Sequence, residues 1–223
     1  EPAFFCDLVA TGPETTASQL RNWLHKETVA LTDEATLKHL LRVAKRRAAL
    51  LVGLADIAGL WPTEEVMRVL SDFADMTLRL TVDVLLRGAA KDGKLALAEP
   101  TNPSLNSGFI VLAMGKLGAH ELNYSSDVDL IVLYEAKHVH FLGDGNMQRF
   151  FERFTRSFVA ILEERTKDGY VFRTDLRLRP DPGATPIALS VAAAETYYES
   201  TGQNWERAAF IKARPVAGDI EAG

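Results

Sequence analysis

The chain has 223 residues, of which 47% are hydrophobic and 25% charged, and its formal net charge is −5. Such a composition is typical of a soluble protein with one large or two small hydrophobic cores. The negative charge argues against general nucleic-acid binding, which usually needs a basic surface. No apolar run approaches the roughly 20 residues of a membrane span, and no signal peptide is evident. We therefore expect no nucleic-acid and no membrane partner.

The single cysteine, Cys6, excludes a disulfide framework within the chain. This fits a reducing compartment and predicts a cytoplasmic protein. The chain begins with Glu1 rather than methionine, and residues 217–223 have the composition of a flexible tail. We expect the chain to be a piece of a longer protein.

Residues 1–98 are predicted to be a helical region. Thr32 is a candidate N-cap, and Thr63, after Trp61-Pro62, is a candidate cap for a second helix. The spacing of three and four predicts one buried face on each helix. The two faces are formed by Leu37, Leu41, Ala44, Ala48, Leu51 and Ala55, and by Val66, Leu70, Phe73, Thr77, Leu80 and Val84. We expect an antiparallel pair that supports the site without taking part in its chemistry.

Basic residues gather on the first of these helices, at Arg42 and at Lys45-Arg46-Arg47. Charged residues on a helix most often form its solvated face, so we expect these side chains on the surface. His25 and His39 have no ligand partner at a metal-binding spacing, and we expect them at the surface or at the edge of the core.

Residues 99–107 are a predicted linker, because Pro, Asn and Ser dominate them, and residues 108–219 form the predicted second domain. This domain opens with the apolar run 109–114, which predicts a buried strand. A turn containing Gly115 and Gly118 then leads to a second apolar strand at residues 130–134.

Two acids stand one residue apart where this second strand begins. Successive side chains of a strand point to opposite faces, so Asp127 and Asp129 share a face while Val128 and Leu130 enter the core. An Asp-x-Asp pattern is often only a solvated strand end. Here glycines and hydroxyls precede it, and two carboxylates in that setting suit Mg²⁺ and a polyphosphate. Such a strand pair resembles the opening of the nucleotidyltransferase fold of the DNA polymerase β superfamily.

The turn at residues 143–145 leads to a predicted helix whose aromatic stripe should cover the sheet. The stripe is formed by Met147, Phe151, Phe154, Phe158 and Ile161. A third strand is predicted within residues 170–180, where period two separates a charged from an apolar face. The charged face has Val171, Arg173, Asp175, Arg177 and Arg179, and the apolar face has Phe172, Thr174, Leu176 and Leu178. A fourth strand at residues 186–190 and helices from Ser190 and Gln203 complete the domain.

The charged face places a third carboxylate, Asp175, among guanidinium groups. This arrangement can hold a metal through the carboxylate and phosphate oxygens through the arginines. The alternative is a half-exposed strand whose charges neutralise one another. The similar position of the acids on two strands favours a metal triad.

Several motifs together resemble the glutamine synthetase adenylyltransferases, also called glutamate-ammonia-ligase adenylyltransferases. The motifs are Gly115-Lys116-Leu117-Gly118, the segment from Glu121 to Leu130, Asp175-Leu176-Arg177-Leu178-Arg179-Pro180, and Trp205-Glu206-Arg207 with Lys212-Ala213-Arg214. The resemblance covers residues 108–219. It implies an α+β fold, in which a nucleotidyltransferase domain with a mixed sheet and flanking helices follows the helical region.

The resemblance also implies a function. The family members transfer AMP, use Mg²⁺ or alternatively Mn²⁺, and have ATP, ADP and phosphate as substrates or products. Their protein substrate is glutamine synthetase, and a nitrogen-signalling protein regulates them. Ser125-Ser126 and Tyr197-Tyr198 look more like the N-terminal half of the family, which removes AMP from a tyrosine by phosphorolysis, than like the C-terminal half, which adds it from ATP.

The family roles map onto particular residues of this chain. The catalytic acids and metal ligands would be Asp127, Asp129 and Asp175. The phosphate contacts would come from Gly115, Lys116, Ser125, Ser126, Arg173, Arg177 and Arg179. Two alternatives stay open: a uridylyltransferase-like or small-molecule nucleotidyltransferase, and a catalytically idle module that senses nucleotide. The retained acids count against the idle module, which would not need them.

Overall fold

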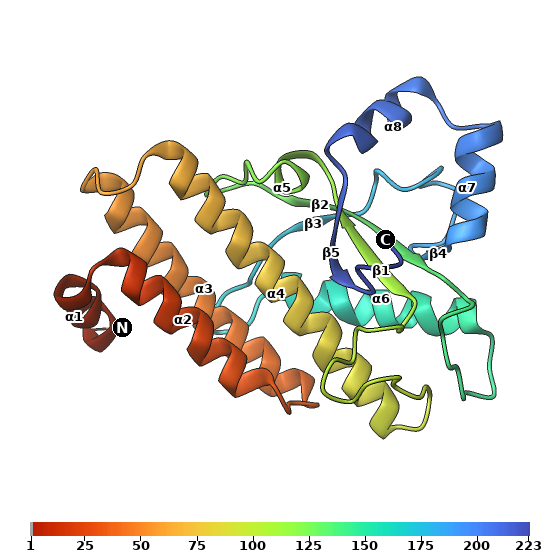
Figure 1. Ribbon diagram of the computed structural model, residues 1–223, viewed down its shortest axis with the longest axis horizontal. Coiled ribbons are helices and arrows are strands. Elements are labelled where there is room, and N and C mark those ends of the chain that lie inside the picture. Colours follow the sequence, from red (N-terminus) through yellow and green to blue (C-terminus); the bar gives the residue numbers. More distant parts are fainter. Residues whose placement is uncertain (1) are drawn as a thin grey trace.

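The computed structural model describes residues 2–223, with a bundle of helices at one end and a sheet at the other (Figure 1). The bundle consists of α1 (Pro2–Thr11), α2 (Pro13–Thr28), α3 (Glu34–Ile57) and α4 (Thr63–Lys91). The last two form the predicted antiparallel pair, and both predicted stripes are buried. No helix within residues 2–223 has both the length and the apolar character that crossing a membrane requires.

Both predicted caps of this pair are wrong. The cap of α3 is Asp33, whose carboxylate accepts a hydrogen bond from the Thr36 amide at 2.7 Å. Helix α4 begins at Thr63 itself, directly after Pro62, and within the described part of the chain it has no side-chain cap. In each case the predicted cap lies one residue from the N-cap position.

The sheet is mixed and has five short strands. They are β1 (Phe109–Ala113), β2 (Val128–Tyr134), β3 (Thr174–Asp175), β4 (Leu189–Ser190) and β5 (Arg214–Gly218). The strand order is β3-β2-β1-β5, with β4 also paired to β2. Strand β1 runs antiparallel to β2 and β5, whereas β2 runs parallel to β3 and β4. The parallel pairing of β2 with β3 places Asp129 opposite Asp175.

The third strand is much shorter than its period-two pattern predicts. The amides of Val171 and Phe172 both donate to the Leu162 carbonyl, so the chain turns here instead of running as a strand. Both side chains are buried, and the prediction that Val171 shares the charged face is wrong.

Strand β5 was not predicted at all. Pro215 and Gly218 argue locally against a strand, and residues 217–223 were expected to form a flexible tail. Instead Arg214–Gly218 pairs with β1, and Ala217 and Asp219 are buried. Gly218 has φ +79°, and a Cβ there would lie 1.9 Å from the Phe109 carbonyl oxygen, so this pairing needs glycine.

Helices flank the sheet. They are the single turn α5 (Gly115–Gly118), α6 (Met147–Glu163), α7 (Val191–Ser200), α8 (Asn204–Ala209) and a 3-10 turn, Phe210–Lys212. The aromatic stripe of α6 is buried from Phe151 to Ile161, as predicted. Helices α7 and α8 follow Ser190 and Gln203, and both residues act as caps.

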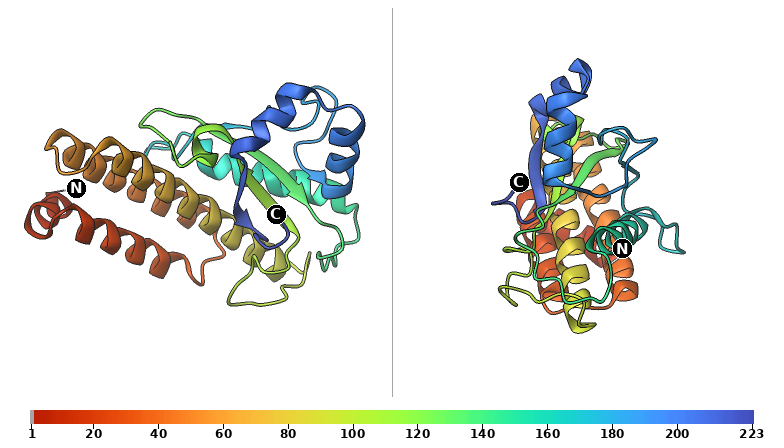
Figure 2. Two further views of the ribbon diagram at one scale, coloured as in Figure 1. Left: turned by 45° about the horizontal axis from the view of Figure 1, so that its top comes forward. Right: turned by 90° about the vertical axis from the view of Figure 1, so that its right-hand side faces the viewer.

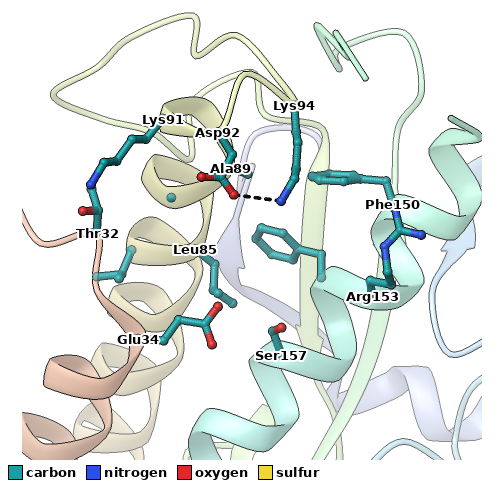
Figure 3. A pocket seen from close by; sticks show the side chains of 13 residues that line it. Thr32, Glu34, Leu85, Ala89, Lys91, Asp92, Lys94, Phe150, Arg153 and Ser157 are labelled. Atoms are coloured by element: carbon teal, nitrogen blue, oxygen red, sulfur yellow. Dashed lines mark hydrogen bonds and ion pairs between the residues drawn. The ribbon is translucent and has the colours of Figure 1, made fainter. Parts of the chain in front are cut away.

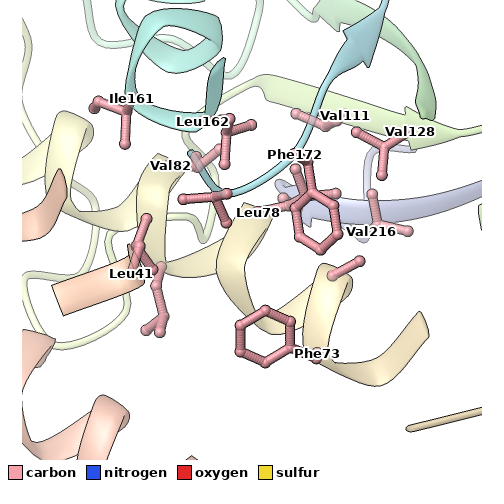
Figure 4. Close-up of a cluster of buried hydrophobic side chains, with 14 of the residues drawn as sticks. Leu41, Phe73, Leu78, Val82, Val111, Val128, Ile161, Leu162, Phe172 and Val216 are labelled. Carbon is pink, nitrogen blue, oxygen red and sulfur yellow. The ribbon is translucent and has the colours of Figure 1, made fainter. Parts of the chain in front are cut away.

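One cluster of buried side chains joins the bundle to the sheet. In Figure 4 the side chains of Phe73 and Leu78 from α4 lie near those of Val111 and Val216 from the sheet and of Phe172. Two further views show α4 running from the bundle to the sheet (Figure 2). The predicted linker, residues 99–107, therefore connects two parts that share a core, and the domain boundaries stay a prediction.

Arg42 lies within this core, so its predicted place on the surface is wrong. Its side chain is fully buried, and its guanidinium donates to the carbonyls of Lys38, Ile161, Glu164 and Gly169. The last three carbonyls belong to the end of α6 and the turn after it. Arg42 therefore fixes α3 against the segment that leads into β3.

We predict that Arg42→Met lowers the free energy of unfolding by at least about 3 kcal/mol, because buried carbonyls lose a charged donor. Urea denaturation would measure the loss. Arg46→Met on the exposed side of the same helix should change it by less than about 1 kcal/mol. Equal effects of the two substitutions would contradict the role given to Arg42.

Candidate functional site

The three predicted acids come together at one edge of the sheet. Asp129 of β2 stands opposite Asp175 of β3 in the parallel register. Asp127 precedes β2 by one residue, and Asp127 and Asp175 both repel the Asp129 carboxylate. The arrangement arises because the Val128 amide donates to the Arg173 carbonyl and starts the pairing of the two strands.

Two of these acids are already paired with arginines. Arg173 Nε lies 2.5 Å from Asp127 Oδ1, and Arg177 Nη2 lies 2.5 Å from Asp175 Oδ2. The hydrogen bonds from Arg177 hold the pKa of Asp175 below its usual value. Within residues 2–223 no group of three His, Cys, Asp or Glu side chains is arranged to hold a metal ion. Asp127 and Asp175 face guanidinium groups instead.

Asp129 has no such arginine pair among residues 2–223, and the unfavourable electrostatic interactions of the site act on its carboxylate. Burial raises its pKa, and repulsion by Asp175 and Asp127 raises it further. The positive charges of Arg177 and Lys116 offset part of this increase. A cation placed here would relieve the repulsion, so the donor set suits a hard divalent ion.

The glycine turn brings its backbone against Asp129. Gly115 has φ +53°, and a Cβ there would lie 2.8 Å from Asp129 Oδ2. Gly118 is constrained as well, because a Cβ there would lie 1.9 Å from the Lys212 carbonyl oxygen. The turn therefore needs both glycines, and it places Lys116, which is exposed, on the same side as the acids.

Ser125 and Ser126 border a cavity of about 240 Å³ beside the acids. Asn123 shapes their loop, since its Oδ1 accepts hydrogen bonds from the Ser125 amide and, at 2.7 Å, from Ser126 Oγ. The cavity is also lined by Lys45, Tyr124, Tyr170, Val171, Phe172 and Arg173. The two serines that are predicted to contact phosphate therefore lie near Arg173. They are separate from the glycine turn, Gly115–Gly118.

The structure does not bring Arg179 to the acids. Its guanidinium donates to the carbonyls of Leu176, Pro182 and Pro186 and holds the loop before β4. Of the three predicted arginines, only Arg173 and Arg177 contact the acid cluster.

Arg214, which the sequence indicated only as part of a motif, anchors the glycine turn. Arg214 forms a bidentate pair with the buried carboxylate of Asp75 on α4, at 2.7 and 2.9 Å. It also donates to the carbonyls of Leu117 and Gly118. The available signal was Asp75 itself, an acid within the apolar pattern of α4, since a buried charge requires a partner.

Glu206 gives the motif Trp205-Glu206-Arg207 a structural role at the start of α8. Its buried carboxylate accepts hydrogen bonds from the Gln203 amide and the Tyr197 hydroxyl. This capping box starts α8 and ties it to α7. Trp205 beside it is 59% exposed, so it takes no part in that packing.

A larger cavity, of about 390 Å³, lies away from the acids between α4 and α6 (Figure 3). Leu85 and Phe150 form part of its apolar wall, and Arg153 stands at its edge. Lys94 at its rim pairs with Asp92 at 2.8 Å. None of the predicted site residues lines this cavity.

Comparison with known proteins identifies the family of the chain. The sequence model of the family described as glutamate-ammonia ligase adenylyltransferase matches residues 4–223. The chain belongs to this family. The match extends over the helical bundle as well as the sheet, beyond the residues 108–219 that carry the motifs.

Individual relatives are named bifunctional glutamine synthetase adenylyltransferase/adenylyl-removing enzyme. One from Mesorhizobium japonicum is 56% identical over 190 residues, which cover 85% of this chain and 19% of the relative. One from Rhizobium meliloti is 52% identical over 201 residues, covering 90% and 20%. One from Rhodopseudomonas palustris is 48% identical over 223 residues, covering 100% and 23%. The chain therefore spans about a fifth of the length of these relatives.

We predict that Asp129→Asn stabilises the metal-free protein by up to about 1 kcal/mol, because it removes a partly buried charge that two other acids repel. Thermal unfolding in the presence of a chelator would measure the change. Asp127→Asn serves as the matched control and should give no gain, since it breaks the pair with Arg173. A clear loss of stability in Asp129→Asn would contradict the repulsion.

Proposed function

We propose that the acid cluster and the glycine turn form the active site of a metal-dependent nucleotidyltransferase that acts on glutamine synthetase. The observation that carries this proposal is the parallel register of β2 and β3, which sets Asp129 opposite Asp175 with Asp127 alongside. Family membership supports the substrate, since the relatives are named for adenylyl transfer to and removal from glutamine synthetase. We also propose that the sheet, with its glycine turn between β1 and β2, belongs to the nucleotidyltransferase fold.

The residues that would hold Mg²⁺, or alternatively Mn²⁺, are Asp127, Asp129 and Asp175. Three carboxylates supply the oxygen ligands that these ions prefer, and the repulsion around Asp129 favours a cation there. A bound ion would supply charge neutralisation for the phosphate groups. For Asp127 and Asp175 to serve as ligands, Arg173 and Arg177 must turn away from them.

The displaced guanidinium groups would then bind phosphate oxygens. Arginine binds phosphate through parallel hydrogen bonds, and both side chains are more than half exposed, so they are free to reorient. Lys116 adds a positive charge on the turn. Phosphoryl-type transfer requires mainly positioning and charge stabilisation, which these residues would provide.

The proposed direction is removal of AMP, following the resemblance of Ser125-Ser126 and Tyr197-Tyr198 to the N-terminal half of the family. An oxygen of inorganic phosphate bonds to the α-phosphorus of the AMP-tyrosine, and the bond from phosphorus to the tyrosine oxygen breaks. The phenolate takes up a proton, and the products are ADP and free tyrosine. ATP would take part in the reverse modification, the addition of AMP.

The cellular setting is part of the same proposal. Cys6 is a free and exposed thiol, which fits a reducing, cytoplasmic compartment. A nitrogen-signalling protein would control the enzyme and thereby nitrogen assimilation. We propose no nucleic-acid and no membrane partner, in keeping with the net charge of −5.

We predict that the Asp127→Asn, Asp129→Asn double variant binds Mn²⁺ at least about tenfold more weakly than the wild type, because two oxygen ligands lose their charge. Electron paramagnetic resonance of free Mn²⁺ would measure the affinity in the presence of ADP. The control is Asp144→Asn, an exposed aspartate in a distant turn. Equal affinity of the folded double variant and the wild type would refute the metal site.

We also predict that the chain, given adenylylated glutamine synthetase, phosphate and Mg²⁺, releases ADP in a phosphate-dependent reaction. Asp175→Asn should lower the rate by about a hundredfold or more, because it removes a group that positions charge in a partly desolvated site. Asp144→Asn should leave the rate unchanged. Consumption of ATP to modify the enzyme, without ADP release from the adenylylated form, would reverse the proposed direction.

A further inference from the structure

Lys45 is half-buried, whereas the sequence predicts it on the solvated face of its helix. Its ammonium group lies over the ring of Phe172, 4.0 Å from the centroid, and 5.8 Å from that of Phe73. Burial lowers its pKa to about 8. Within residues 2–223 its Nζ has no hydrogen bond to a protein group and no carboxylate partner. A half-buried cation with only aromatic contacts lacks a counter-ion.

This ammonium group borders the cavity beside the acid cluster, together with a second cation. Arg173 donates through Nε to Asp127 and through Nη2 to the Ser125 carbonyl, and its Nη1 has no partner among the described residues. Ser125 and Ser126 add two hydroxyl groups to the same wall. Two cations and two serines thus line one cavity, from α3, the loop before β2 and the segment before β3.

The carboxylates around this cavity are already engaged. Asp56 accepts a hydrogen bond from the Tyr124 hydroxyl at 2.7 Å, and Asp127 accepts from Arg173. No carboxylate is among the residues that line the cavity. The cavity, of about 240 Å³, exceeds the roughly 30 Å³ that one water molecule occupies, so it has room for a small tetrahedral ion.

We propose that this cavity is a binding site for a phosphate-type oxyanion, with Lys45 as its principal cation and Arg173 and the Ser125 hydroxyl as further donors, while the Ser126 hydroxyl stays engaged with Asn123. An ammonium group is a compact charge that binds phosphate well, and an oxyanion would supply the counter-ion that Lys45 lacks. The site borders the acid cluster through Arg173, which contacts both. Either free inorganic phosphate or the phosphate of a bound nucleotide has the required chemistry.

The site also deepens the function proposed above, on which its role in the reaction rests. In phosphorolysis the attacking phosphate must be held beside the metal-binding acids, with one oxygen directed at the α-phosphorus of the adenylyl group. The Lys45 cavity would hold the phosphate on the side of Asp127, to which Arg173 of its wall is paired. The binding of an anion itself rests on the geometry alone.

The test is calorimetric titration of the metal-free protein with sodium phosphate and, separately, with ADP. Lys45→Met keeps a long side chain over the rings but removes the charge, and it should weaken phosphate binding by about tenfold or more. Lys45→Arg should restore binding to within about threefold of the wild type. The matched control is Lys38→Met, a substitution two turns earlier on α3 where the lysine pairs with Glu164.

The outcomes separate the ligand sources and the two proposals. Phosphate binding that Lys45→Met weakens supports a free-phosphate site, and the same effect with ADP alone supports a nucleotide phosphate. Binding that is absent in the wild type, or equal in folded Lys45→Met and wild type, would overturn the inference even if ADP release occurs. Lys45-dependent binding in a protein that never releases ADP would keep this site while the proposed function fails.

Discussion

The candidate site depends on the buried ion pair between Arg214 and Asp75. A half-formed pair of this kind would be costly, because either charge left alone in the core loses its hydration without compensation. Arg214 uses its remaining donors on the carbonyls of Leu117 and Gly118 and so connects α4, α5 and β5. This fixes the glycine turn, and the turn in turn sets Gly115 against Asp129. The bundle thereby determines where the backbone of the turn stands relative to the acids.

The acid cluster shows a balance between stability and ligand binding. Asp127 and Asp175 are compensated by Arg173 and Arg177, which keeps the sheet edge stable in the absence of a ligand. Asp129 keeps an unfavourable environment, which a bound cation or protonation of the carboxylate would relieve. The same arginines suit phosphate oxygens, so under the proposed function these ion pairs would exchange for a metal on the acids and a phosphate on the guanidinium groups.

The bundle positions several parts of the site. Arg42 secures the turn that leads into β3, Asp75 holds the glycine turn, and Lys45 faces the cavity beside the acids. The match of the family over residues 4–223 agrees with a unit in which the bundle and the sheet belong together. Since helices and strands also share one core, a change in the packing of α3 or α4 would be transmitted to the acid-bearing strands.

The sequence by itself determined the features that depend on local periodicity and on motif. The stripes of α3 and α4, the aromatic face of α6, strands β1 and β2, and the starts of α7 and α8 follow from spacing and capping chemistry that a few neighbouring residues contain. The acids were found because alternation along one strand fixes the face of Asp127 and Asp129.

Tertiary structure decided what depends on distant partners. Strand β5 exists only because β1 offers it an edge, and Arg179 turns to its own loop, whose carbonyls are within reach of its guanidinium. Lys45 is half-buried because Phe73 and Phe172, which are far away in sequence, lie under its ammonium group. No local sequence pattern indicates that these three residues are close in space.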